Sequence, residues 1–203
     1  MEKPFNIIVL ATGNGTNLGA IIDAKNEGHL QSVEILGVIS NKSAVGALKK
    51  AEDYGCPAKF IGAANKTREE YDQELIDYIC ELEAQTNQKV DLICLIGYMR
   101  ILSPKFIQQF PRKIINVHPA LLPSYGGPGM LGDYIHEAVL ANNDSETGMT
   151  IHYVDEGVDT GEIILQTRVP VELGDTVETL RHKVQSQEKL GYVKVLEDFS
   201  AAH

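Results

Sequence analysis

The chain has 203 residues and a net charge of −10, and 43% of its residues are hydrophobic. This composition is that of a soluble globular protein, and its apolar runs are far shorter than the roughly 20 residues of a membrane span. It has no basic stripe, so we expect neither nucleic acid nor a membrane among its partners. Three scattered cysteines and the lack of a signal-peptide pattern predict a cytoplasmic protein, which we expect to be one domain, residues 1–203.

Strand-like and helix-like segments alternate over the first 150 residues. Apolar runs predict strands at residues 5–11, 33–40, 59–61, 90–96 and 113–117. Apolar periodicity and helix-end residues predict helices at residues 17–26, 43–54 and 104–110, and one that opens at residue 67. Ser43 is the expected N-cap of the second helix, and Thr67 with Glu70 has the spacing of a capping box.

The last quarter of the chain changes character. Residues 148–154 and 162–169 are predicted to be two antiparallel strands joined by the loop at 155–161, and a terminal helix is predicted over 175–199. Strands that alternate with helices imply parallel pairing with helices on both faces. The predicted fold is therefore α/β in three layers, with a mostly parallel Rossmann-like sheet and an antiparallel C-terminal strand pair.

The end of the strand at 113–117 carries the most informative motif. Side chains alternate along a strand, so Asn116 and His118 point to the same side, and Pro119 stiffens the chain that follows. An amide that polarises a carbonyl group and an imidazole that moves a proton are what acyl transfer requires. The alternative is a strand that simply stops at a polar turn.

A glycine-rich loop, residues 13–17, joins the first strand to the first helix. Such a loop offers backbone N–H groups and a helix N-terminus to a phosphate, although it is also compatible with a simple turn. A dinucleotide site would need a third glycine where Leu18 stands and an acidic residue near Ser40. The loop therefore favours a monophosphate, at the same edge of the sheet as Asn116 and His118.

Together these segments resemble the glycinamide ribonucleotide formyltransferases, a folate-dependent family of purine synthesis. The resemblance extends from Asn6 to about Phe199. It rests on the stretches at 13–17, 40–42, 68–72, 97–104, 116–119, 148–154, 158–161 and 184–188.

The resemblance implies transfer of the formyl group of 10-formyltetrahydrofolate, as co-substrate, to the amine of glycinamide ribonucleotide, without a metal. It implies a one-carbon transferase that is a monomer or a weak homodimer. The matching catalytic positions are Asn116, His118 and Asp159. The matching substrate positions are Gly15, Thr16, Asn17, Gln185 and Glu188. The matching folate positions are Arg68, Met99, Arg100, Ile101, Leu102, Asn116, Asp155, Glu156, Gly157, Val158 and Asp159.

In the implied reaction, the amine attacks the formyl carbon, and Asn116 and protonated His118 stabilise the oxyanion. A carboxylate beside an imidazole favours the charged ring, so we expect Asp159 to raise the pKa of His118. His136 is expected to have a structural role near the site, and His152 to be a packed strand residue. One departure is Pro128, in the loop at 124–132, where many relatives carry a basic residue.

Three other functions stay open. The acceptor could be another amine, such as methionyl-tRNA or an amino sugar, but we expect neither the extra C-terminal domain nor the basic surface of the tRNA enzymes. A formyltetrahydrofolate hydrolase would usually carry an N-terminal regulatory domain, which we do not expect here. A non-catalytic nucleotide-binding module would not require Asn116, His118 and Asp159 to converge.

Overall fold

The computed structural model describes residues 3–203, whose strands form one seven-stranded sheet in the order β3-β2-β1-β4-β5-β6-β7. The strands are β1 (Phe5–Ala11), β2 (Val33–Ser40), β3 (Ala58–Phe60), β4 (Leu92–Ile96), β5 (Ile114–His118), β6 (Glu146–Tyr153) and β7 (Ile163–Pro170). The helices are α1 (Thr16–Asn26), α2 (Gly46–Tyr54), α3 (Arg68–Thr86), α4 (Pro104–Gln109), α5 (Asp133–Ala141) and α6 (Val177–Ala201).

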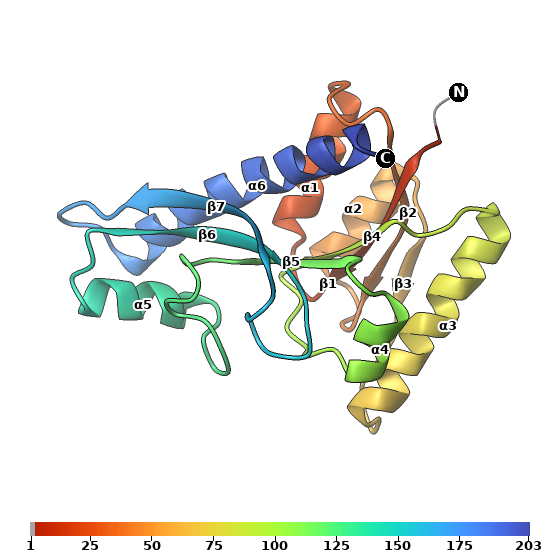
Figure 1. Ribbon diagram of the computed structural model, residues 1–203, viewed down its shortest axis with the longest axis horizontal. Coiled ribbons are helices and arrows are strands. Elements are labelled where there is room, and N and C mark those ends of the chain that lie inside the picture. Colours follow the sequence, from red (N-terminus) through yellow and green to blue (C-terminus); the bar gives the residue numbers. More distant parts are fainter. Residues whose placement is uncertain (1–2) are drawn as a thin grey trace.

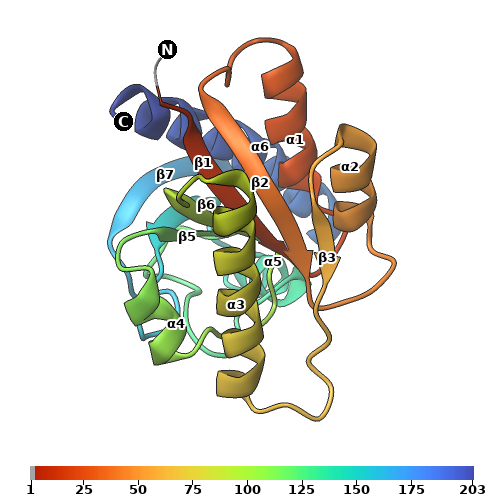
Figure 2. The ribbon, with the colours of Figure 1, turned by 90° about the vertical axis from the view of Figure 1, so that its right-hand side faces the viewer.

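The sheet is mixed in the predicted way. Strands β3, β2, β1, β4 and β5 pair in parallel, and β6 is antiparallel both to β5 and to β7. Helices α1, α2 and α6 lie on one face, and α3 and α4 lie on the other (Figure 1, Figure 2). The predicted α/β class, with three layers and an antiparallel C-terminal strand pair, is confirmed.

Strand β1 shows why the centre of the sheet is apolar without alternation. Ile7 and Val9 pack into the core beneath α1, α2 and α6, whereas Ile8 and Leu10 pack into the core beneath α3 and α4. Both faces of the strand are covered, so every residue of β1 is buried. No helix among residues 3–203 combines the length and the apolarity needed to cross a membrane.

The predicted N-cap is correct for α3 and wrong for α2. The capping box of Thr67 and Glu70 is present at the start of α3, as predicted. The prediction of Ser43 as an N-cap is wrong, because α2 begins only at Gly46 after a left-handed residue, Ala44. Gly46 lies against the glycine loop, where an added Cβ would come within 3.0 Å of the carbonyl oxygen of Asn14.

Helix α5 was not predicted from the sequence. It follows a glycine-rich loop and begins at Asp133, and the preceding Gly132 provides no side-chain cap. The other predicted bounds agree with the structure to within two residues.

The carboxyl ends of the central strands are tied together at one edge of the sheet. The Thr12 hydroxyl donates to Asn41 Oδ1 at 2.7 Å and accepts the Met99 N–H at 3.0 Å. These two bonds link the segments that follow β1, β2 and β4. In parallel α/β sheets, ligands bind at this edge. The carboxyl end of β5 lies at the same edge, because β5 pairs in parallel with β4.

Candidate active site

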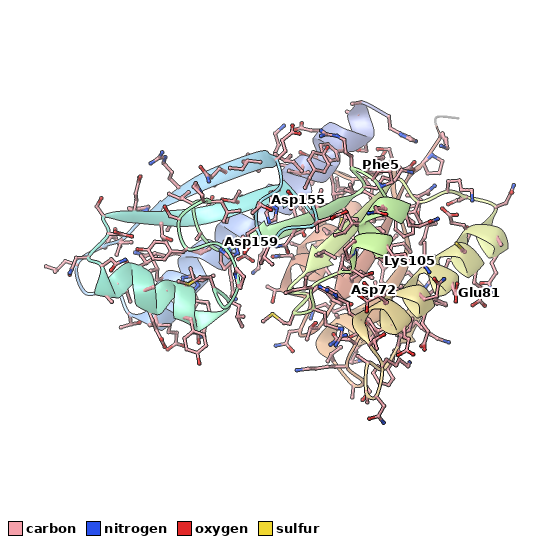
Figure 3. All side chains as sticks on the ribbon, turned by 60° about the horizontal axis from the view of Figure 1, so that its bottom comes forward. Phe5, Asp72, Glu81, Lys105, Asp155 and Asp159 are labelled. Carbon is pink, nitrogen blue, oxygen red and sulfur yellow. The ribbon has the colours of Figure 1, made fainter. Side chains whose placement is uncertain are left out.

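The antiparallel pairing of β5 with β6 builds the centre of the site. Asn116 lies opposite His152 in the register, and the loop between β6 and β7 returns Asp159 to the same place (Figure 3). His118 Nδ1 lies 3.4 Å from Asp159 Oδ2, and His152 Nε2 lies 3.6 Å from Asp159 Oδ1. The structure thus brings together the three predicted catalytic residues and adds His152.

His152 orients the amide of Asn116. Its Nδ1 lies 2.9 Å from the carbonyl oxygen of Tyr153, which can only accept, so Nδ1 carries the ring proton. Its Nε2 then accepts from Asn116 Nδ2 at 3.3 Å. This bond fixes which end of the amide carries the donors and leaves its second N–H for a group in the cleft.

His152 was predicted only as a packed strand residue. It is buried, at 2% exposure, but its ring also contacts two of the proposed catalytic groups. The signal that could have revealed it is the antiparallel register, which places His152 across from Asn116. That register depends on two distant strands and cannot be deduced from either strand alone.

Asp159 is held in an unusual conformation. Its φ is +58°, a left-handed value that non-glycine residues rarely adopt. Oδ2 accepts the Gly127 N–H at 3.0 Å. Burial alone would raise the pKa of the carboxyl group. The imidazoles of His152 and His118, when protonated, and the Gly127 N–H outweigh burial and hold that pKa below its ordinary value. The carboxylate is therefore charged at neutral pH.

The pKa of His118 is lowered overall, so the prediction of a net rise is wrong, although Asp159 does act in the predicted direction. The ring is only 4% exposed, and burial lowers its pKa. Asp159 and the Tyr125 carbonyl act in the expected upward direction, while His152 adds to the lowering. Burial outweighs the upward contributions, so the imidazole is mostly neutral at neutral pH.

A cleft of about 400 Å³ opens beside these residues. Its walls include His118 and most of the predicted folate and substrate positions, namely Met99, Arg100, Ile101, Leu102, Asn116, Asp155, Gly157, Val158, Asp159, Gln185 and Glu188. The loop from Gly127 to Gly132 lines it as well. One cleft therefore combines the proposed catalytic groups with apolar and polar walls.

The glycine loop is linked to this cleft by a hydrogen bond to Glu188, a residue of α6 that lines it. Gly15 has a φ of +64°, and an added Cβ would lie 2.8 Å from the Cβ of Ala47, so the position requires glycine. Thr16 begins α1, and Asn17 Nδ2 donates to Glu188 Oε2 at 3.1 Å. Burial raises the pKa of Glu188, while the bond from Asn17 opposes the rise.

Residues 5–196 match the family model described as formyl transferase. The chain belongs to the formyl transferase family.

Similar proteins and solved structures agree with this assignment. The phosphoribosylglycinamide formyltransferase of Escherichia coli (strain K12) is 39% identical over 196 residues, which cover 96% of this chain and 87% of that protein. The human trifunctional purine biosynthetic protein adenosine-3 is 43% identical over 188 residues, which cover 92% of this chain. The matched region is only 17% of the length of the human protein.

Two solved structures share the fold. Glycinamide ribonucleotide transformylase 1 from Symbiobacterium toebii has a TM-score of 0.87 at 35% identity, covering 98% of this chain and 89% of that chain. Phosphoribosylglycinamide formyltransferase from Coxiella burnetii, in complex with CHES, has the same TM-score at 36% identity and the same coverage of both chains.

In this formyl transferase, buried polar groups support the loop at 99–102. Met99 and Ile101 are 53% and 51% exposed and present apolar surface at the cleft. Arg100 stacks over the Tyr71 ring, with 4.5 Å from its guanidinium carbon to the ring centroid. Asp72, on α3 (Figure 3), accepts the Ser103 N–H that follows the loop. These contacts brace an apolar surface that lines the cleft.

Several predicted residues do not line the cleft of this formyl transferase. Gly15, Thr16 and Asn17 are not among its lining residues, but Asn17 donates a hydrogen bond to Glu188, which is one of them. Arg68 is half-exposed with its Nε 3.7 Å from Glu69, and Glu156 accepts from Gln108 at 2.9 Å. The folate roles of Arg68 and Glu156 therefore stay predictions.

Two further predictions concern His136 and metal binding. His136 is buried in α5 at 2% exposure, and it is absent from the cleft lining. Within residues 3–203, no three His, Cys, Asp or Glu side chains are grouped so that they could hold a metal ion.

Proposed function

We propose that this protein transfers the formyl group of 10-formyltetrahydrofolate to the amine of glycinamide ribonucleotide, a reaction of purine biosynthesis. The observation that carries the proposal is the convergence of Asn116, His118 and Asp159 in a cleft that adjoins a phosphate-type glycine loop. The names of the Escherichia coli relative and of both solved structures support the same reaction.

The two substrates are assigned to opposite parts of the site. The loop of Gly15, Thr16 and Asn17 offers backbone N–H groups at the start of α1 to the substrate phosphate. Gln185 and Glu188, on α6, are assigned to the ribose side of the same substrate. On the other side, the braced loop at 99–102 and the segment at 155–159 offer apolar surface and backbone groups to the folate.

Asn116 is assigned to the oxyanion. When the amine attacks the formyl carbon, the formyl oxygen gains negative charge, and the free N–H of the Asn116 amide can donate to it. His152 fixes the orientation of that amide before the substrate binds. One preorganised donor of this kind is typically worth about 3 to 4 kcal/mol in the transition state.

His118 is assigned to proton transfer. Its Nε2–H donates to the Tyr125 carbonyl, so the lone pair of the neutral ring is on Nδ1, on the side of Asp159. Nδ1 takes the proton that the amine loses as the new C–N bond forms, directly or through a water held by Asp159. The resulting imidazolium is stabilised by Asp159 and returns the proton to the departing nitrogen as the old C–N bond breaks.

The pH dependence follows from this assignment. The neutral ring is the active form, so kcat/KM should fall as the pH drops through the pKa of His118, which burial places below its ordinary value. Replacing Asp159 with Asn removes a charge that favours the imidazolium, so this acid limb should move to lower pH. The measurement is the pH profile of both proteins, because the substrate amine ionises identically in each. An acid limb that stays in place, or moves to higher pH, would contradict the assignment.

The His152→Phe variant tests the orientation of Asn116. Loss of the acceptor should lower kcat by about 3- to 10-fold with little change in KM, the effect of one neutral hydrogen bond. The control is the double variant with Asn116→Ala, which should be no slower than Asn116→Ala alone because the two residues act as one unit. Additive losses would show that His152 acts independently of Asn116.

Consumption of 10-formyltetrahydrofolate, with and without glycinamide ribonucleotide, tests the proposed function. We expect turnover that depends on the ribonucleotide. Equal turnover without any amine would indicate a hydrolase, and turnover only with methionyl-tRNA or an amino sugar would indicate another acceptor. No turnover in any arm would favour a non-catalytic nucleotide-binding module.

The remaining properties are proposals that rest on sequence and family. We propose a cytoplasmic monomer or weak homodimer that forms one domain over residues 1–203 and uses neither a metal, a nucleic acid nor a membrane. The single sheet and the family match over residues 5–196 support one domain.

A further inference from the structure

A short loop contacts both members of the His118–Asp159 pair. His118 Nε2 donates to the carbonyl oxygen of Tyr125 at 2.7 Å, and the Gly127 N–H donates to Asp159 Oδ2 at 3.0 Å. The Tyr125 carbonyl is an acceptor for the imidazole, and the Gly127 N–H is a donor to the carboxylate. Both bonds are strongest when His118 is a charged imidazolium and Asp159 a charged carboxylate. The loop therefore favours the ion-pair state that the ring reaches during proton transfer.

The side chain of Tyr125 fixes this loop to a distant part of the fold. Its hydroxyl donates to Asp144 Oδ2 and accepts from Asn142 Nδ2 at 2.7 Å, at the turn between α5 and β6. The backbone of Tyr125 has a φ of +56°, which is disfavoured for a non-glycine residue. Such a conformation persists only where surrounding contacts impose it, and the tethered hydroxyl is one such contact.

We propose that Tyr125 is a positioning residue, whose tethered hydroxyl holds its own carbonyl against His118 Nε2 and so sets the proton affinity and tautomer of that ring. The catalytic consequence rests on the proposed function, whereas the effect on the ring does not. The groups that face His118 are Asp159 from the β6–β7 loop, His152 from β6 and the Tyr125 carbonyl. Tyr125 is the one of these whose placement depends on a hydroxyl tether.

Tyr125→Phe removes the tether and keeps the ring. With the carbonyl less firmly held, the imidazolium of His118 loses one partner, so the ring should titrate at lower pH. Formyl transfer should slow by about 3- to 10-fold in kcat, with KM for both substrates nearly unchanged. Asn142→Ala removes a neutral partner of the same hydroxyl. It should also lower the pH at which His118 titrates and lower kcat, each to a smaller degree.

The experiment has two arms and a matched control. Nitrogen-15 NMR of labelled histidine follows the titration of the His118 ring, and steady-state kinetics follow kcat and KM over pH. Tyr134→Phe removes a hydroxyl from an exposed tyrosine on α5, outside the cleft. It should leave the His118 titration, kcat and KM at their wild-type values.

The outcomes separate this inference from the proposed function. A lower His118 titration midpoint in Tyr125→Phe supports the tether even if the wild-type protein forms no product. An unchanged midpoint and tautomer in the folded variant would overturn the inference even if the wild-type protein transfers the formyl group. Equal effects of Tyr125→Phe and Tyr134→Phe would also overturn it.

Discussion

Replacing His118 with alanine is expected to lower kcat for formyl transfer by about 10²- to 10⁴-fold, the usual contribution of a positioned acid–base group. The ring is the group that can both take the proton from the amine and return it to the departing nitrogen. Its Nε2 is bound by Tyr125 and its Nδ1 faces Asp159, so alanine provides no substitute for either contact. KM for glycinamide ribonucleotide should change little, because the glycine loop lies outside the immediate contacts of His118.

Steady-state kinetics at the pH optimum check this expectation. The matched control is His29→Ala, which removes a surface imidazole with 62% of its side chain exposed and should retain the wild-type rate. A His118→Ala protein that works at a near-wild-type rate would remove His118 from the mechanism.

The second large effect is expected for Asn116→Ala. Removing one donor to a developing oxyanion typically costs about 10²- to 10³-fold in kcat. The loss should fall on kcat rather than on KM, since the amide is assigned to a charge that exists only in the transition state. The pH profile should keep its shape, because His118 retains its partners Asp159 and Tyr125.

Asn26→Ala serves as the comparison, because it removes an exposed amide at the end of α1 and should have no kinetic effect. If Asn116→Ala instead raised KM with kcat unchanged, the amide would contribute to substrate binding and not to oxyanion stabilisation.

Much of the fold could be predicted because its determinants are local. The apolar run of β1 and the capping box of Thr67 and Glu70 each depend on a few adjacent residues, and both predictions are confirmed. The start of α2 could not be predicted in this way, because Gly46 packs against a loop that is distant in sequence. Helix α5 was missed because Gly132 provides no capping signal.

The site was predictable in its residue types and less so in its energetics. The neighbouring positions of Asn116 and His118 follow from strand alternation, and the structure brings Asp159 to them. The lowered pKa of His118 was not predictable, because a nearby carboxylate can be guessed from sequence whereas the depth of burial cannot. The contacts of His152 and Tyr125 depend on strand register and on a distant turn, and neither is a property of a single segment.

The most direct measurement is a single-turnover reaction with 10-formyltetrahydrofolate labelled with carbon-13 in its formyl group. Protein, labelled folate and glycinamide ribonucleotide are mixed, and NMR identifies the molecule that carries the label. The account predicts that the label appears on the amine nitrogen of the ribonucleotide, and much more slowly with His118→Ala. Label found only in free formate, or left on the folate, would contradict it.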